Sequence, residues 1–173
     1  MTVAAAEVGF EQFVREHASR LLQAAVLLTG NRDRGEELLQ DTLTHLYPRW
    51  GMVTAADSPI AYVRRTLMNR YVSSSRSPRH RDTLTWDVPE RWDRHDLSEE
   101  VALRRDIWQA LGRLPGRPRA AVILRFFDDQ TDEEIAAVLG CRAASVRSII
   151  SRAMASMRND DSMHDTHNKA GSW

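Results

Sequence analysis

Apolar residues recur at helical spacing in three segments of the N-terminal part of the chain. Residues 10–28 predict a first amphipathic helix, which ends at Thr29-Gly30-Asn31. A second predicted helix begins near Asn31 or Asp33 and ends before Pro48, because a proline disfavours helical backbone at the residue that precedes it. A third begins at Ser58-Pro59, a capping serine followed by proline at the first helical position. Its expected buried positions are Ile60, Val63, Leu67 and Tyr71.

Helical spacing returns in residues 98–158. Ser98 caps a predicted helix, and the turn at residues 115–118 starts the next one. Thr131 to Glu134 spell a capping box for a short helix that Gly140 ends, and a last helix is predicted from about Ala143 to Arg158. Buried positions are expected at Val101, Ile107, Ala110, Leu111 and Leu114 in the first of these helices, at Ala121, Val122 and Phe126 in the second, and at Ile135, Ala136 and Leu139 in the third.

No segment alternates apolar and polar residues long enough to predict a sheet. The expected fold is therefore all-α, with two small helical bundles joined by a linker. We place the first bundle at residues 1–76, the linker at 77–97, the second bundle at 98–158 and a flexible tail at 159–173. The linker segment loses the helical period and contains two prolines and five acidic residues.

The 24 basic and 24 acidic side chains cancel, but their distribution is uneven. Residues 58–81 contain six arginines and no acid, which makes this segment a basic block. No apolar stretch approaches the roughly 20 residues that a membrane span needs, and the N-terminus does not resemble a secretory signal. The lone Cys141 cannot form an internal disulfide. These features predict a cytoplasmic protein without direct membrane insertion.

Residues 131–158 have the layout of a helix-turn-helix, with a short capped helix, a turn at Gly140-Cys141-Arg142 and a longer helix. The longer helix has one apolar face, and no carboxylate stands between Glu134 and Asp160. Such a helix can enter the major groove, where arginine offers paired donors to guanine. The alternative is a solvated face of an ordinary bundle, although such faces usually mix both charges. The candidate DNA-binding residues are Arg142, Ala144, Ser145, Arg147, Ser148, Ser151 and Arg152.

A second candidate site combines positive charge with aromatic rings in residues 62–71. Cationic side chains can track phosphates while aromatic rings stack on unpaired bases, which fits DNA whose strands are separating. The alternative is that the tyrosines pack in the core, and for Tyr71, on the apolar face of its helix, we favour core packing. The candidate DNA-binding residues here are Tyr62, Arg64, Arg65, Asn69 and Arg70.

Taken in their order along the chain, residues 62–71 followed by residues 131–158, the two sites resemble the extracytoplasmic-function group of bacterial sigma factors, the smallest members of the sigma-70 family. The resemblance covers almost the whole sequence. In the first half it lies in residues 36–43 with the later Tyr47 and Trp50, which resemble the polymerase-binding helix of the family, and in Ala61 to Arg65 and Asn69-Arg70. In the second half it lies in Leu114-Pro115 and in segments 120–127, 134–140 and 145–153.

The resemblance implies a division of labour between the two bundles. The first would be a region-2-like domain that binds core RNA polymerase and recognises and melts the -10 element, and the second a region-4-like domain that reads the -35 element. The implied partners are the beta-prime clamp and beta flap of core polymerase, promoter DNA and an anti-sigma factor, and no cofactor is implied. Polymerase-binding residues are expected at Glu37, Gln40, Asp41 and Thr44.

Three positions depart from the family pattern and bear on which promoters are read. Tyr62 stands where the melting segment usually has tryptophan, and Ser73 stands at a frequently acidic position. Ile149 replaces a commonly basic residue of the recognition helix. The linker fits binding at two sites, because the 17 residues 82–98 extend to about 58 Å, comparable with a promoter spacing of some 17 base pairs.

The sequence leaves two alternatives to a sigma factor. A stand-alone helix-turn-helix regulator would use the N-terminal bundle to dimerise and would protect a palindrome. An enzyme ranks third, because the sequence contains no nucleophile elbow, glycine-rich phosphate loop or paired histidine motif. His164 and His167 lie in a tail with no nearby cysteine, so no metal site is expected.

Overall fold

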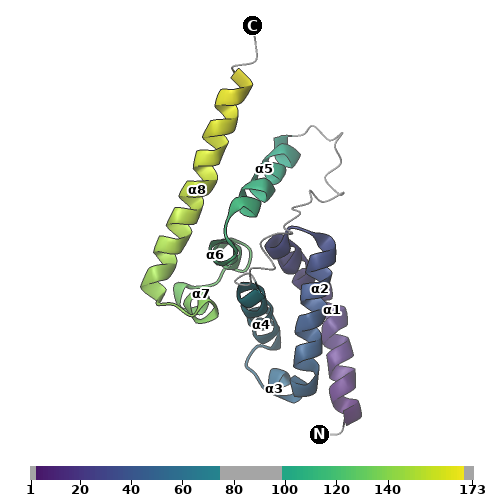
Figure 1. Ribbon diagram of the computed structural model, residues 1–173. Helices are drawn as coiled ribbons and strands as arrows, with labels where there is room; N and C mark the ends of the chain where they lie inside the picture. The colour runs from purple at the N-terminus through teal and green to yellow at the C-terminus, as the bar shows by residue number, and fades with distance from the viewer. Residues whose placement is uncertain (1–2, 75–98, 170–173) are drawn as a thin grey trace. The chain divides into compact units, whose positions relative to one another are not determined.

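The computed structural model describes the backbone of residues 3–74 and 99–169, and the side chains of residues 9–74 and 103–158 (Figure 1). Throughout these ranges the regular structure is helical and contains no strand, so the predicted all-α class is confirmed. The protein divides into two compact units, Met1–Leu84 and Thr85–Trp173. The division falls inside the predicted linker 77–97, which lies outside the described residues, as does the Ser98 cap.

The first unit begins with a long helix and ends with the arginine-rich one. Its elements are α1 (Val3–Thr29), α2 (Arg32–Leu46), the 3₁₀ turn η1 (Tyr47–Arg49), α3 (Trp50–Thr54) and α4 (Pro59–Ser74). Asn31 caps α2 as expected, its side-chain oxygen accepting a hydrogen bond of 3.0 Å from the backbone nitrogen of Arg34. The short helix α3 was not predicted, because five residues are too few to show a helical period.

Close packing of α1 on α2 depends on one glycine. A Cβ atom built on Gly35 would lie 2.7 Å from Cγ2 of Val26 and 3.0 Å from its backbone nitrogen. Only glycine lets the two backbones approach this closely. In α4, Val63, Leu67 and Tyr71 are buried as predicted, whereas Ile60 is half-buried.

An aromatic cluster ties α1 to the α3 segment. Phe10 meets Tyr47 and Trp50 edge-on, and Phe13 also meets Trp50, each with ring centroids 5.0 Å apart. Trp50 is buried, so this residue, which the resemblance grouped with the polymerase-binding helix, is part of the core.

The second unit is built from four helices, among them the predicted helix-turn-helix. They are α5 (Glu99–Arg113), α6 (Gly116–Phe126), α7 (Asp132–Leu139) and α8 (Ala143–Lys169). Gly140 ends α7 in the left-handed conformation, with φ of 61°, as its position predicts. Helix α8 runs on to Lys169 instead of ending at Arg158, because no proline or glycine interrupts the sequence before Gly171.

Two predicted core positions of this unit are wrong. Ile107 is 48% exposed, and its neighbour Trp108 is buried in its place. One residue turns a helix by about 100°, so a small error in the assumed face exchanges the two. Phe126 is 62% exposed and is the last residue of α6. Periodicity predicts which face of a helix is apolar, but that face is buried only where neighbouring elements cover it.

The remaining testable core positions agree with the sequence analysis, while Val101 lies outside the described side chains. The confirmed buried residues are Ala110, Leu111, Leu114, Ala121, Val122, Ile135, Ala136 and Leu139.

A buried arginine holds the corner between α5 and α6. Arg119 is 2% exposed and donates hydrogen bonds to three carbonyl oxygens at the end of α5. Its Nε reaches Leu111 at 2.9 Å, and its Nη2 reaches Gly112 and Leu114 at 2.8 Å each. The Arg119 guanidinium therefore caps the C-terminal end of α5, where the Leu111 carbonyl also accepts from the backbone nitrogen of Leu114 at 3.1 Å.

Candidate nucleic-acid and polymerase interfaces

Helix α8 presents the outward surface that the sequence predicts. Val146 and Ala153 are buried on its inner face, and Ile149 is half-buried at the edge of that face. A shallow hollow on the outer side is lined by Arg147, Ser148, Ser151 and Arg152. The exposed candidates are Arg142, Ala144, Ser145, Arg147, Ser148, Ser151 and Arg152. The structure therefore brings the predicted DNA-binding residues of this helix onto one side, free of acidic neighbours on α8 itself within residues 143–158.

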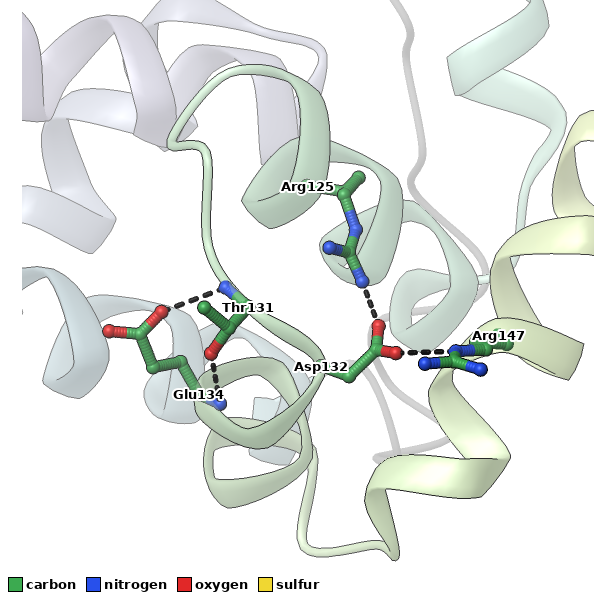
Figure 2. A network of polar contacts seen from close by, with 5 residues as sticks. All are labelled: Arg125, Thr131, Asp132, Glu134 and Arg147. Carbon is green, nitrogen blue, oxygen red and sulfur yellow. Dashed lines mark hydrogen bonds and ion pairs between the residues drawn. The ribbon is translucent and has the colours of Figure 1, made fainter.

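One acidic residue of α7 reaches this surface and was missed by the sequence analysis. Figure 2 shows Asp132, the first residue of α7, between two arginines. Its Oδ2 accepts a hydrogen bond of 2.8 Å from Nε of Arg147, and its Oδ1 pairs with Arg125 of α6. The hydrogen bond from Arg147, followed by the charge of Arg125, holds the pKa of Asp132 below its ordinary value, and the same bond raises the pKa of Arg147.

The capping box at the start of α7 fixes the backbone beside Asp132 (Figure 2). The side-chain oxygen of Thr131 accepts from the backbone nitrogen of Glu134 at 3.3 Å, and the Glu134 carboxylate accepts from the backbone nitrogen of Thr131 at 2.8 Å. Hydrogen bonding of the Glu134 carboxylate to Thr131, through the backbone N–H first and the side chain second, stabilises the ionised form and lowers the pKa of Glu134. The sequence spacing predicted both contacts correctly.

Helix α4 carries the second candidate site, and its predicted DNA-binding residues lie on different sides of the helix. Tyr62 is 37% exposed and Arg65 is exposed, and these two residues and Asn69 lie along one side of the helix at spacings of three and four. Arg64 is half-buried and faces away from Tyr62, since residues two apart do not share a helix face. Tyr71 is buried, as the core alternative predicted.

The predicted polymerase-binding residues lie on the outer side of α2. Glu37, Gln40, Asp41 and Thr44 are all exposed. Oδ2 of Asp41 lies 3.6 Å from Nη2 of Arg70, an ion pair between α2 and α4. A hollow of about 660 Å³ between these helices is lined by Glu37, Asp41, Asn69 and Arg70, among others. The structure thus joins candidates for polymerase and DNA binding that the sequence treated separately.

Neither a metal centre nor a membrane span is found in the described part of the protein. Its side chains include no group of three His, Cys, Asp or Glu residues that could hold a metal ion. The side chains of His164 and His167 lie outside the described residues. None of the described helices is both long enough and apolar enough to cross a membrane.

Several known proteins are similar to this chain in sequence or in fold. Residues 104–157 match the family described as sigma-70, region 4. The protein is 31% identical to the RNA polymerase sigma-E factor of Streptomyces coelicolor over 87% of this chain and 85% of the relative. It is 30% identical to the sigma-E factor of Streptomyces avermitilis, over 93% of this chain and 89% of the relative.

A solved structure shares the fold. It is the sigma factor RpoE from Bartonella quintana, crystallised in complex with the anti-sigma factor NepR. Its TM-score with this protein is 0.67 at 24% sequence identity, covering 87% of this chain and 95% of that one.

The two-unit helical fold, the helix-turn-helix and these relatives define the class of the protein. The chain belongs to the extracytoplasmic-function group of the sigma-70 family of RNA polymerase sigma factors. Its function is that of a sigma factor, which directs core RNA polymerase to promoters at the start of transcription. The resemblance seen in the sequence is thereby confirmed, and the alternative of a stand-alone regulator is not supported.

Proposed function

We propose that this sigma factor reads its promoters at two places while holding core polymerase with a third surface. Helix α8 enters the major groove of the -35 element, and the exposed side of α4 captures the separated strands of the -10 element. The outer side of α2 binds the polymerase. In domain terms, residues 1–76 act as region 2 and residues 98–158 as region 4. The observation that carries this proposal is the exposed, small and basic outer surface of α8, opposite the buried Val146 and Ala153.

Arginine chemistry gives α8 its expected base specificity. Arg147 and Arg152 are exposed beside Ser148 and Ser151 in the same hollow. A guanidinium can donate two parallel hydrogen bonds to guanine, and such a pair discriminates against other bases by about 1–3 kcal/mol. Nε of Arg152 donates to the Ser148 carbonyl at 3.1 Å, which leaves the donors on its two terminal nitrogens for DNA.

Strand opening is assigned to Tyr62, Arg65 and Asn69, which share one side of α4. An unpaired base stacked on an aromatic ring gains about 1–3 kcal/mol, which offsets part of the cost of unpairing. Arg65 contributes a phosphate contact. Arg64, on another side of the helix, is assigned to phosphate anchoring away from the stacked base.

The polymerase surface on α2 combines carboxylates with small polar groups at spacings of three and four, a stripe suited to basic residues on a protein partner. We assign core polymerase, through its beta-prime clamp, to Glu37, Gln40, Asp41 and Thr44, and its beta flap to the second unit. The polymerase supplies the bond-making chemistry. An anti-sigma factor that masks these surfaces is a further expected partner, and a role with polymerase places the protein in the cytoplasm.

In vitro transcription with core polymerase and genomic DNA fragments tests the proposal and yields the promoters. Arg147→Ala or Arg152→Ala should lower transcription that depends on the -35 element by about 5- to 150-fold, if each loses a paired contact to guanine. Arg158→Ala, which removes the same charge from an exposed position further along α8, is the matched control and should stay within about 2-fold. Unchanged transcription by both site variants would remove α8 from -35 recognition.

Strand opening is separated from initial binding by permanganate footprinting of unpaired thymines. Replacing Arg64 and Arg65 together with Ala should reduce the open complex more than the closed complex. Replacing Arg15 and Arg20, two exposed arginines on α1, together with Ala controls for the loss of two charges. Equal losses in both complexes would show that Arg64 and Arg65 anchor phosphates without contributing to strand opening.

A further inference from the structure

The guanidinium of Arg147 is highly exposed and yet held in one place. Its side chain is 84% exposed, a setting in which a long arginine ordinarily samples many rotamers. Here Nε is bonded to Asp132, fifteen residues earlier and on a different helix. We propose that Asp132 is a positioning residue that fixes the base-reading geometry of Arg147 and thereby sets base preference in the -35 element, an inference that rests on the proposed reading of this element by α8.

The anchor itself is rigid. The Asp132 side chain is only 13% exposed, and its second oxygen pairs with Arg125 of α6 (Figure 2). Its backbone directly follows Thr131, the capping residue of α7. The carboxylate therefore cannot follow Arg147 outward. Through this carboxylate, the position of the Arg147 guanidinium is fixed relative to α6 and α7 as well as to its own helix, α8.

The bonding pattern leaves the reading edge of Arg147 available. Asp132 uses only Nε, and the guanidinium makes no further hydrogen bond to any residue that the structure describes. The two terminal nitrogens are thus ready to donate together to N7 and O6 of a guanine. Two arginines share one carboxylate, so this trio keeps a net positive charge and still attracts DNA.

A positioning role makes different demands from two simpler roles. If Asp132 only stabilised the packing of α7 on α8, its loss would lower folding stability without changing which base pair is preferred. If it only weakened DNA attraction through its charge, any neighbouring acid would do the same. Glu133 is exposed in the same turn and has no hydrogen bond to Arg147, so Glu133→Gln removes the same charge and leaves the positioning bond intact.

The experiment uses the full-length protein with core polymerase and a pool of promoters whose -35 element is randomised, with transcripts sequenced to give the preference at each position. We expect Asp132→Asn to reduce preference at the position read by Arg147 by about 3- to 10-fold, part of the discrimination that a paired contact provides. Both Asp132→Asn and Glu133→Gln should retain or raise affinity for non-specific duplex, because each removes a negative charge. Only Asp132→Asn should lose base preference.

A double-mutant cycle with Arg147→Ala completes the test. Positioning predicts that Asp132→Asn has no further effect on base preference once Arg147 is absent. The inference is overturned if Asp132→Asn keeps the wild-type preference, or if its effect is unchanged in the Arg147→Ala background. A failure of the proposed function itself is distinguishable, because then Arg147→Ala would leave the preference unaltered or the wild type would give no promoter-specific transcripts. Thermal unfolding of each variant reports the packing contribution separately.

Discussion

Replacing Gly35 with alanine tests how the backbone approach between α1 and α2 sustains the first unit. The added Cβ would lie 2.7 Å from Cγ2 of Val26, 3.0 Å from its nitrogen and 3.2 Å from its Cα. Carbon atoms in favourable contact lie about 3.5–4.0 Å apart, so the helices must separate by roughly 0.5–1 Å. A change of the Val26 rotamer relieves only the first contact, because the other two are made by backbone atoms.

The size of the effect follows from two opposing terms. Alanine is favoured over glycine inside a helix by about 1 kcal/mol. Overpacking typically costs about 1–3 kcal/mol, and the rigid backbone contacts place this site at the upper end. We expect a net loss of about 1–2 kcal/mol in the free energy of unfolding, which for a unit of this size lowers Tm by about 5–15 °C.

Thermal and urea unfolding followed by circular dichroism measure the loss, and hydrogen exchange should place it in α1 and α2. Gly9→Ala is the matched control, since its Cβ would meet only Nε1 of Trp50 at an ordinary 3.7 Å. This control should be neutral or stabilising. Adding Val26→Ala to the Gly35→Ala variant should recover part of the loss. A Tm for Gly35→Ala equal to or above wild type would refute the close-approach argument.

Three further predictions concern the second unit. Arg119→Met should lower its stability by about 3 kcal/mol or more, because three carbonyl hydrogen bonds are lost in a buried setting, and urea unfolding that matches wild type would contradict this. Thr131→Ala should cost about 1 kcal/mol through loss of the α7 cap, measured in the same way against Ser156→Ala on exposed α8 surface. The lowered pKa of Asp132 means that its pairing stabilises the folded state above the ordinary carboxyl pKa of 3.8 and that this contribution is lost as pH falls through the folded pKa. The stability difference between wild type and Asp132→Asn should therefore be present near pH 6 and shrink below about pH 4, and a difference that does not change with pH would rule out the ion pair as its cause.

Local hydrogen-bond chemistry made much of the fold predictable from the sequence. The Asn31 cap, the Thr131–Glu134 capping box and the Gly140 terminator each follow from residues within a few positions of one another. Helix faces were predicted less well. An error of only one residue in the assumed face was enough to predict Ile107 as buried in place of Trp108.

For the candidate sites, the sequence found the outer residues of α8 and the exposed stripe of α2. It missed the contacts of Asp132 with Arg147 and of Asp41 with Arg70. Both join side chains from different helices, and their meeting depends on how those helices pack, which periodicity does not encode. From sequence, a carboxylate at the first position of a helix indicates a favourable dipole interaction alone.

The buried guanidinium of Arg119 changes how the end of α5 can move. The last turn of a helix ordinarily frays, because water can hydrogen-bond to its last carbonyl groups whether the turn is open or closed. At Leu111, Gly112 and Leu114 fraying would strand a charged group away from solvent, so the turn opens only together with α6. The elbow between α5 and α6 thus behaves as a single cooperative piece, and bending within this half of the molecule has to occur elsewhere.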